Sequence, residues 1–290
     1  MSIISIICTA LRDLIFLFIN EPRAPATSKI LWRRAAIESG AAAAKIPRII
    51  IQTHETNEVS FETFVATRQL IHMNPDYAYR FFDSEKRRAY IAKNMPAVLG
   101  AYDKLGHGTY QADLFRYCVL YVNGGVYIDC KSTCVEPLSR FIPDEATFVA
   151  FVDCIPFRLA TSFLACTARH PLMGEFLRAC AQHATSEDYG ENQLDMGGPE
   201  TCGKIINEIL GQKPADSLAI GRAEVVHAPT GATYSFDLVG WRHFFSEYFF
   251  VDERAPTPVF RRIYNGFWWS WAHLRNRYEL WWALQCVFRS

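Results

Sequence analysis

A helical run that stops at two glycines and turns at once into a short apolar strand sets the architecture of this chain. Between residues 109 and 122 the apolar positions recur at helical spacing. Asn123, Gly124 and Gly125 then end the helix, because glycine adopts the left-handed backbone that a helix C-terminus favours. Residues 126–129 follow directly as a strand, so the two elements form one compact helix–turn–strand unit of an α/β sheet.

Strand and helix patterns alternate through the rest of the chain. Such alternation predicts an α/β fold with a mixed, mostly parallel sheet flanked by helices, in which ligands bind beyond the carboxyl ends of the strands. His54 and Asp83 directly follow the first two strands, so each either borders a cleft or simply ends a strand in a solvated loop. Strands are expected at residues 46–53, 77–82, 126–129, 147–153, 161–166 and 225–227, and helices at 61–73, 85–93, 96–105, 109–122, 171–183 and from 199 onward.

Four polar side chains of the helix–turn–strand unit are predicted to meet. Asp113 and Arg116 are three residues apart on the helix and therefore share a neighbouring face. Asp129 and Lys131 lie at or just past the strand end, on the same side of the strand. Each pair has an ordinary alternative, an ion pair on the helix or at the surface, but the joint arrangement favours a polar site.

Composition excludes several classes of protein. The chain has 290 residues, half of them hydrophobic, which is enough to bury a large core and argues against a disordered protein. Its 30 basic and 30 acidic residues give zero net charge, which argues against a basic nucleic-acid binder. The nine cysteines lack the close paired spacing of a zinc site or disulfide framework, so we expect buried thiols.

The two ends of the chain are predicted to lie apart from a domain at residues 46–259. Residues 1–45 are expected to hold an amphipathic helix and a linker. Within them, residues 3–19 suit a helix on a membrane surface or packed on the domain, and a signal anchor stays an open alternative. Residues 260–290 hold five of the seven tryptophans together with five arginines, which is typical of either a packing helix or a membrane-surface helix.

Three stretches of the sequence resemble glycosyltransferase family 32, which includes mannosyltransferases and bacterial polysaccharide-building enzymes. They are IPRIIIQTHET at 46–56, NPDYAYRFFD at 74–83 and QADLFRYCVLYVNGGVYIDCKSTCVEPL at 111–138, and MGGP at 196–199 continues the likeness weakly. The resemblance implies a GT-A-like, Rossmann-related fold, a nucleotide-sugar donor, and transfer that retains the anomeric configuration.

The resemblance also implies roles for the residues that match it. Asp113, with Arg116 beside it, would hold hydroxyls of the donor sugar, and Asp129 would be the first acid of the Asp-x-Asp motif. Gly124 and Gly125 would form a close turn that lets the donor approach the backbone. Further donor contacts are expected at Ile49, Gln52, Thr53, His54, Tyr127, Gly198 and His227.

The motif departs from the family pattern at its second acid, where Asp129-Cys130 is followed by Lys131. Lysine carries only hydrogen-bond donors, so it cannot hold Mg²⁺ or Mn²⁺ as a carboxylate does. Three outcomes stay open. Lys131 contacts the donor diphosphate in place of a metal; Asp129 holds the cation with another carboxylate such as Asp153 or Glu136; or the protein binds sugar without transferring it.

The resemblance therefore implies a retaining hexosyltransferase that uses a UDP- or GDP-sugar and a glycan, polysaccharide or lipid-linked acceptor. A divalent cation, Mn²⁺ or Mg²⁺, is an open requirement, and no nucleic-acid partner is expected. The alternatives are a catalytically inactive sugar- or nucleotide-binding protein and a membrane-surface interaction protein. The expected location is the cytoplasm or the cytoplasmic membrane face, with peripheral membrane contact, or a Golgi-type signal anchor in a eukaryote.

Overall fold

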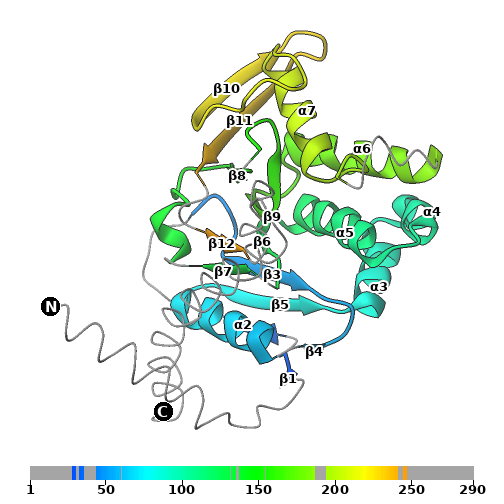
Figure 1. Cartoon of the computed structure of the whole chain (residues 1–290), viewed down its shortest axis with the longest axis vertical. Coiled ribbons are helices and arrows are strands. Elements are labelled where there is room, and N and C mark those ends of the chain that lie inside the picture. Colours follow the sequence, from blue (N-terminus) through cyan, green and yellow to red (C-terminus); the bar gives the residue numbers. More distant parts are fainter. Residues whose placement is uncertain are drawn as a thin grey trace, which may run out of the picture.

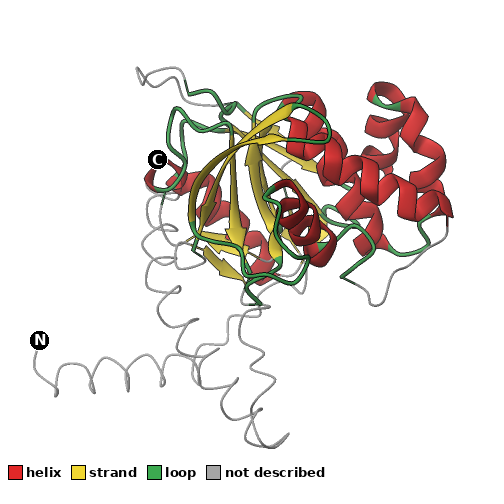
Figure 2. Ribbon diagram, turned by 90° about the horizontal axis from the view of Figure 1, so that it is seen from above, coloured by secondary structure: helices red, strands yellow, loops and turns green. Residues whose placement is uncertain are grey.

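The computed structural model describes residues 28–30, 33–35, 44–59, 61–130, 132–134, 137–153, 155–186, 194–240 and 244–246. Most of them form one twisted sheet with helices packed on both faces (Figures 1 and 2). The predicted N-terminal helix at 3–19 and the aromatic tail at 260–290 lie outside the described residues. No helix within the described part of the chain has the length and apolar character needed to cross a bilayer.

The central sheet has eight strands, of which five run in one direction. β3 is parallel to β5 and β6, and β8 is parallel to β11, while β9 runs antiparallel between β6 and β8. The expected α/β class, with a mixed, mostly parallel sheet flanked by helices, is confirmed. In spatial order the strands are β10 (Gly221–His227), β11 (Ala232–Val239), β8 (Phe148–Val152), β9 (Leu159–Cys166), β6 (Gly125–Ile128), β3 (Ile49–Thr53), β5 (Ala78–Phe82) and β2 (Arg33–Arg34).

Several strands outside the predicted set extend this sheet or lie beside it. β2 lies upstream of the predicted domain boundary at residue 46 and pairs with β5. β11 was not predicted, and it forms a hairpin with β10 that carries the far edge of the sheet. Two small sheets complete the set, formed by β1 (Ser28–Lys29) with β4 (Glu58–Val59) and by β7 (Ser132–Cys134) with β12 (Phe244–Ser246).

The helices divide between the two faces of the sheet. Residues of α5 and α6 join one buried cluster with Ile51 of β3, whereas residues of α2 join a second cluster with Ile50. Neighbouring residues of one strand serve opposite clusters because strand side chains alternate between the faces. The helices of the described residues are α2 (Phe61–Met73), α3 (Ser84–Asn94), α4 (Pro96–Lys104), α5 (Gly108–Asn123), α6 (Pro171–Ser186) and α7 (Pro199–Ile209), and a 3₁₀ turn lies at Leu138–Arg140.

The cysteines that the structure describes as free thiols are all buried, as predicted for this part of the chain. Burial raises the pKa of Cys118 to about 12, and it raises that of Cys202 to about 12 as well. Thiols held protonated in this way act as small apolar side chains. The five are Cys118, Cys130, Cys166, Cys180 and Cys202.

The glycine pair between α5 and β6 is required by the protein's own backbone. Gly124 and Gly125 have φ values of 65° and 108°, in the left-handed region that favours glycine. A Cβ on Gly125 would lie 2.8 Å from the Ile49 carbonyl oxygen, and one on Gly124 would lie 2.6 Å from the Ala168 nitrogen. The resemblance assigned this space to the donor, but the chain itself occupies it, at the end of β6 opposite to Asp129.

We expect Gly125→Ala to lower the free energy of unfolding by about 3 kcal/mol, because left-handed strain adds to a clash with a rigid carbonyl. Urea unfolding followed by circular dichroism measures this loss. Gly100→Ala is the matched control, since nothing lies within 4 Å of its added Cβ in α4 and alanine favours a helix interior. Equal stability of the two variants would contradict the close packing of β6 on β3.

Candidate active site

Arg116 joins helix α5 to the carboxyl end of strand β6. Its Nη2 lies 3.0 Å from Oδ1 of Asp113 and 3.4 Å from Oδ1 of Asp129. Its Nη1 donates a hydrogen bond to the Thr161 carbonyl of β9, and its guanidinium lies 4.5 Å from the centre of the Tyr127 ring. One buried cation therefore ties together two carboxylates from different elements.

The convergence predicted from the helix–turn–strand unit is thus present for three of its four side chains. Helical spacing places Asp113 next to Arg116, and the short strand β6 brings Asp129 to them. Lys131, the fourth, lies outside the described residues.

Asp129 is the member of this cluster that reaches outward. Its side chain is 29% exposed, against 8% for Asp113. The Tyr127 hydroxyl donates to Asp129 Oδ1 at 2.8 Å, and the Asp129 amide donates to the Ser162 carbonyl at 2.9 Å. Tyr127 itself is buried beneath Arg116, so it orients Asp129 instead of offering a free hydroxyl to a ligand.

Two of the three side chains predicted on β3 as donor contacts are buried and bonded within the protein. Gln52 is fully buried; its Oε1 accepts hydrogen bonds from Thr67 and Tyr79, each at 3.1 Å. Thr53 is also buried, and its hydroxyl donates to the Phe82 carbonyl at 2.7 Å. Ile49 begins β3, at the end opposite to Asp129. The side chains of Gln52 and Thr53 thus hold β3 to its neighbours, and the donor contacts expected on this strand stay predictions.

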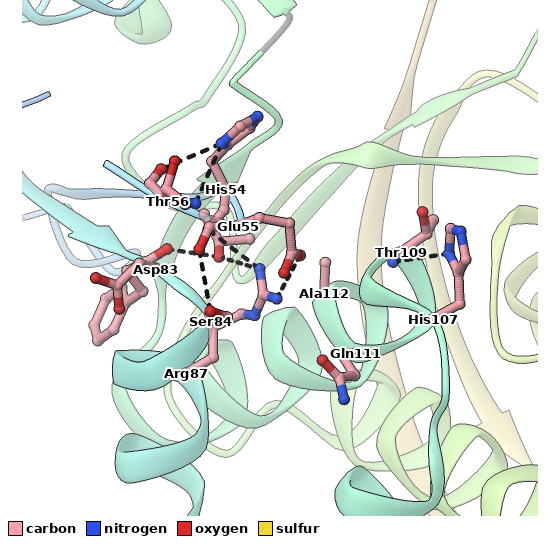
Figure 3. Close-up of polar contacts among 12 residues, drawn as sticks. His54, Glu55, Thr56, Asp83, Ser84, Arg87, His107, Thr109, Gln111 and Ala112 are labelled. Carbon is pink, nitrogen blue, oxygen red and sulfur yellow. Dashed lines mark hydrogen bonds and ion pairs between the residues drawn. The ribbon is translucent and has the colours of Figure 1, made fainter. Parts of the chain in front are cut away.

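The turn after β3 carries the polar groups that do reach the surface (Figure 3). His54 is half-buried, and its Nδ1 lies 3.2 Å from the Thr56 carbonyl oxygen. Behind the turn, Arg87 of α3 is buried and donates to the Thr53 hydroxyl at 3.0 Å and to Glu55 Oε1 at 2.6 Å. His54 keeps its predicted place at this edge, and Glu55 and Arg87 are additions that the sequence did not single out.

Of the two alternatives for Asp83, the structure favours the one in which it simply ends a strand. It is the N-cap of α3, where its carboxylate accepts a hydrogen bond from the Lys86 amide at 2.8 Å. The hydroxyl of the next residue, Ser84, donates to the Glu55 carbonyl at 3.1 Å. Asp83 thus fixes the start of α3 and with it the buried position of Arg87.

The remaining predicted residues lie at different distances from the Arg116 cluster, which consists of Arg116, Asp113 and Asp129. Gly198 is the N-cap of α7, and its neighbour Gly197 accepts a hydrogen bond from Tyr117 of α5 at 2.6 Å, so α7 begins beside the cluster. Asp153 follows β8 at the same edge of the sheet, with β9 between β8 and β6. His227 ends the edge strand β10, which three strands separate from β6, and it lies beside the start of β11, away from the Arg116 cluster; its donor contact stays a prediction.

The described residues do not by themselves form a cation site. Among them, no group of three or more histidine, cysteine or acidic side chains is arranged to hold a metal ion. Oδ1 of Asp129 is already shared by Arg116 and Tyr127. Lys131 and Glu136 lie outside the described residues, so the three outcomes for the variant motif stay predictions.

Burial raises the pKa of Asp113 to about 6; the Arg116 charge opposes this shift and the Asp129 charge adds to it. The carboxyl group is therefore protonated below that pH and becomes a pure hydrogen-bond acceptor above it. If Asp113 accepts from sugar hydroxyls, donor affinity should rise as pH increases through 6, and should fall about tenfold between pH 7 and pH 5. Calorimetric titration across pH 5–7.5 checks this. Asp113→Asn should bind weakly with a flat profile, and a steep profile in that variant would assign the titration elsewhere.

Comparison with known proteins places this site within a matched region. Residues 62–148 match the family described as glycosyltransferase sugar-binding region containing DXD motif. Inositol phosphoceramide mannosyltransferase 3 of Schizosaccharomyces pombe is 37% identical over 101 residues, which are 34% of this chain and 28% of that protein. Mannosyl phosphorylinositol ceramide synthase SUR1 of Saccharomyces cerevisiae is 28% identical over 135 residues, 46% of this chain and 34% of that protein. The chain thus matches about a third of the length of these relatives.

A solved structure titled PaToxG Glycosyltransferase aligns with a TM-score of 0.49 at 16% identity, covering 57% of this chain and 70% of that one.

Proposed function

We propose that this chain, whose residues 62–148 match the glycosyltransferase sugar-binding region containing DXD motif, transfers a hexose from a nucleotide sugar to a hydroxyl acceptor. The observation that carries the proposal is the Arg116 cluster, in which Asp113 of α5 and Asp129 of β6 meet at the carboxyl edge of the sheet. This edge is where open α/β sheets bind their ligands.

The residues of the cluster suit separate parts of such a donor. Carboxylates accept hydrogen bonds from sugar hydroxyls, which fits the buried Asp113. Asp129 is more exposed and would face the donor diphosphate. The guanidinium of Arg116 holds both carboxylates in one orientation and places positive charge where the leaving diphosphate becomes more negative.

Mannose is the hexose we favour, because the relatives with the matching region are named mannosyltransferases. The proposed acceptor is a glycan, polysaccharide or lipid-linked sugar, with retention of the anomeric configuration. We propose that the protein works in the cytoplasm or on the cytoplasmic membrane face, with a signal anchor as the alternative.

The decisive test measures donor hydrolysis by the purified full chain with a panel of UDP- and GDP-sugars, with and without Mn²⁺. Release of nucleoside diphosphate from one donor supports the proposal, and proton NMR of the released sugar reports the anomer formed first. Tight donor binding without release would favour the inactive sugar- or nucleotide-binding protein. If the protein neither binds nor hydrolyses any of these donors, the proposed function is overturned.

Replacing Lys131 with aspartate restores the second acid of the motif and should increase the Mn²⁺ dependence of donor release at least tenfold if the lysine acts in place of a cation. The measurement is the ratio of initial rates with Mn²⁺ and with EDTA in both proteins. Lys131→Met separates loss of the lysine charge from gain of a carboxylate. An unchanged ratio in Lys131→Asp would count against this role.

A further inference from the structure

Glu55 presents a carboxylate that the protein holds on one side and leaves open on the other. Its Oε1 lies 2.6 Å from Nη2 of Arg87, whose side chain is only 1% exposed, whereas the Glu55 side chain is 56% exposed. Within the described part of the chain, Oε2 has no hydrogen-bond partner. The side chain is therefore oriented from behind by a buried cation, with one oxygen available to a ligand.

The backbone of Glu55 is fixed as firmly as its side chain. Ser84 donates to the Glu55 carbonyl from both its amide, at 3.2 Å, and its hydroxyl, at 3.1 Å. Arg87 also donates to the His54 carbonyl at 3.4 Å and to the hydroxyl of Tyr102 at 3.3 Å. A surface glutamate normally moves freely, and this anchoring restricts it to one direction.

That direction leads to the first turn of α5. A Cβ on Gly108 would lie only 2.4 Å from Glu55 Oε1, so the carboxylate rests against the start of the helix. Figure 3 shows Thr109 and Ala112 of α5 beyond the carboxylate. These two positions share one helix face with Asp113 and Arg116, because residues at spacings of three, four and seven align.

This face of α5 thus runs from the Glu55 carboxylate, at the start of the helix, to the Arg116 cluster. Eight residues separate Gly108 from Arg116, which corresponds to about 12 Å along the helix axis. A donor whose sugar and diphosphate lie at Asp113 and Asp129 would extend its nucleoside along this face toward Glu55. The turn at His54 lies at the same end, where the sequence predicted a donor contact.

We infer that Glu55 accepts hydrogen bonds from the ribose hydroxyls of the nucleotide donor, an inference that rests on the proposed function. A carboxylate repels phosphate, so a group at this end of the site suits the hydroxyl-bearing part of the ligand. Acidic side chains bind ribose hydroxyls in the same way in dinucleotide-binding folds. Arg87 is a positioning residue, since it is buried and would act on the ligand only through the Glu55 carboxylate that it orients.

The test couples a change in the protein to a change in the ligand. Calorimetric titration gives the affinities of UDP and GDP, and of their 2′-deoxy and 3′-deoxy forms, for the wild-type chain and for Glu55→Gln and Glu55→Ala. In the wild type, loss of the contacted hydroxyl should weaken binding about tenfold or more. In both variants the same deoxy change should weaken binding less than threefold, because its partner is gone.

Glu58→Gln is the matched control. Glu58 lies three residues further along the chain, has a 51% exposed side chain and pairs with Lys29 at 3.2 Å, so its variant should keep wild-type affinities and the wild-type deoxy penalty. Equal deoxy penalties in wild type and Glu55 variants would overturn the inference alone, leaving the proposed function standing. Absence of UDP and GDP binding to the wild type would overturn both.

Discussion

Replacing Arg116 with methionine should lower the free energy of unfolding by about 3–5 kcal/mol and slow sugar transfer at least a hundredfold. Removal of one partner from a buried ion pair leaves an uncompensated buried charge, and here two carboxylates, Asp113 and Asp129, lose their shared cation. The Thr161 carbonyl also loses its donor. Methionine keeps much of the volume, so the loss reports charge and hydrogen bonding more than packing.

The effect is measured by urea unfolding and by initial rates of donor release on the same preparations. Arg178→Met is the matched control, because Arg178 also pairs with an acid three residues away, Glu175, but is 67% exposed. An exposed pair of this kind contributes less than about 1 kcal/mol. If the two variants lose similar stability, Arg116 does not hold the buried cluster described above.

The part of the site that could be predicted is the part that local geometry determines. Helical spacing alone places Asp113 beside Arg116, and the short distance from the glycine turn to the end of β6 brings in Asp129. None of these contacts needs knowledge of which strand lies next to which. The alternation of strands and helices likewise predicts the class of sheet without its full order.

The contacts on β3 could not be predicted because their partners come from elements distant in the sequence. Gln52 meets Thr67 of α2 and Tyr79 of β5, and only the assembled sheet reveals that its amide is already used. The position of His227 could not be predicted for a related reason. It ends a strand, as predicted, but the unpredicted hairpin with β11 carries that strand to the far edge of the sheet.

Arg87 and Glu55 were missed because nothing in the sequence separates them from ordinary surface residues. Helix α3 reads SEKRRAYIAKN, with several cationic positions of which only Arg87 is buried. A buried arginine leaves no periodic signature, because its partners are the Thr53 hydroxyl and the His54 carbonyl at the end of another element. Sequence patterns identify apolar faces well and identify buried polar groups poorly.

Asp129→Ala should abolish sugar transfer, by a factor of at least a hundred, while the protein stays folded. Asp129 is partly exposed at a strand end, so its loss removes one hydrogen bond from Tyr127 and one of the two carboxylates of Arg116. Arg116 keeps Asp113, and the expected stability cost is only about 1 kcal/mol. The electrostatic contribution to the transfer step, which is usually the largest one, is lost with the carboxylate.

Comparing Asp129→Ala with Arg116→Met distinguishes a residue that stabilises the fold of the site from one that takes part in sugar transfer. Both variants should be inactive, but only the arginine variant should lose several kcal/mol, because it alone leaves buried charge unpaired. Asp103→Ala, which breaks an exposed pair between α4 and Arg88 of α3, should keep both activity and stability. Wild-type turnover in Asp129→Ala would place the chemistry elsewhere on the sheet edge, whatever the arginine variant does.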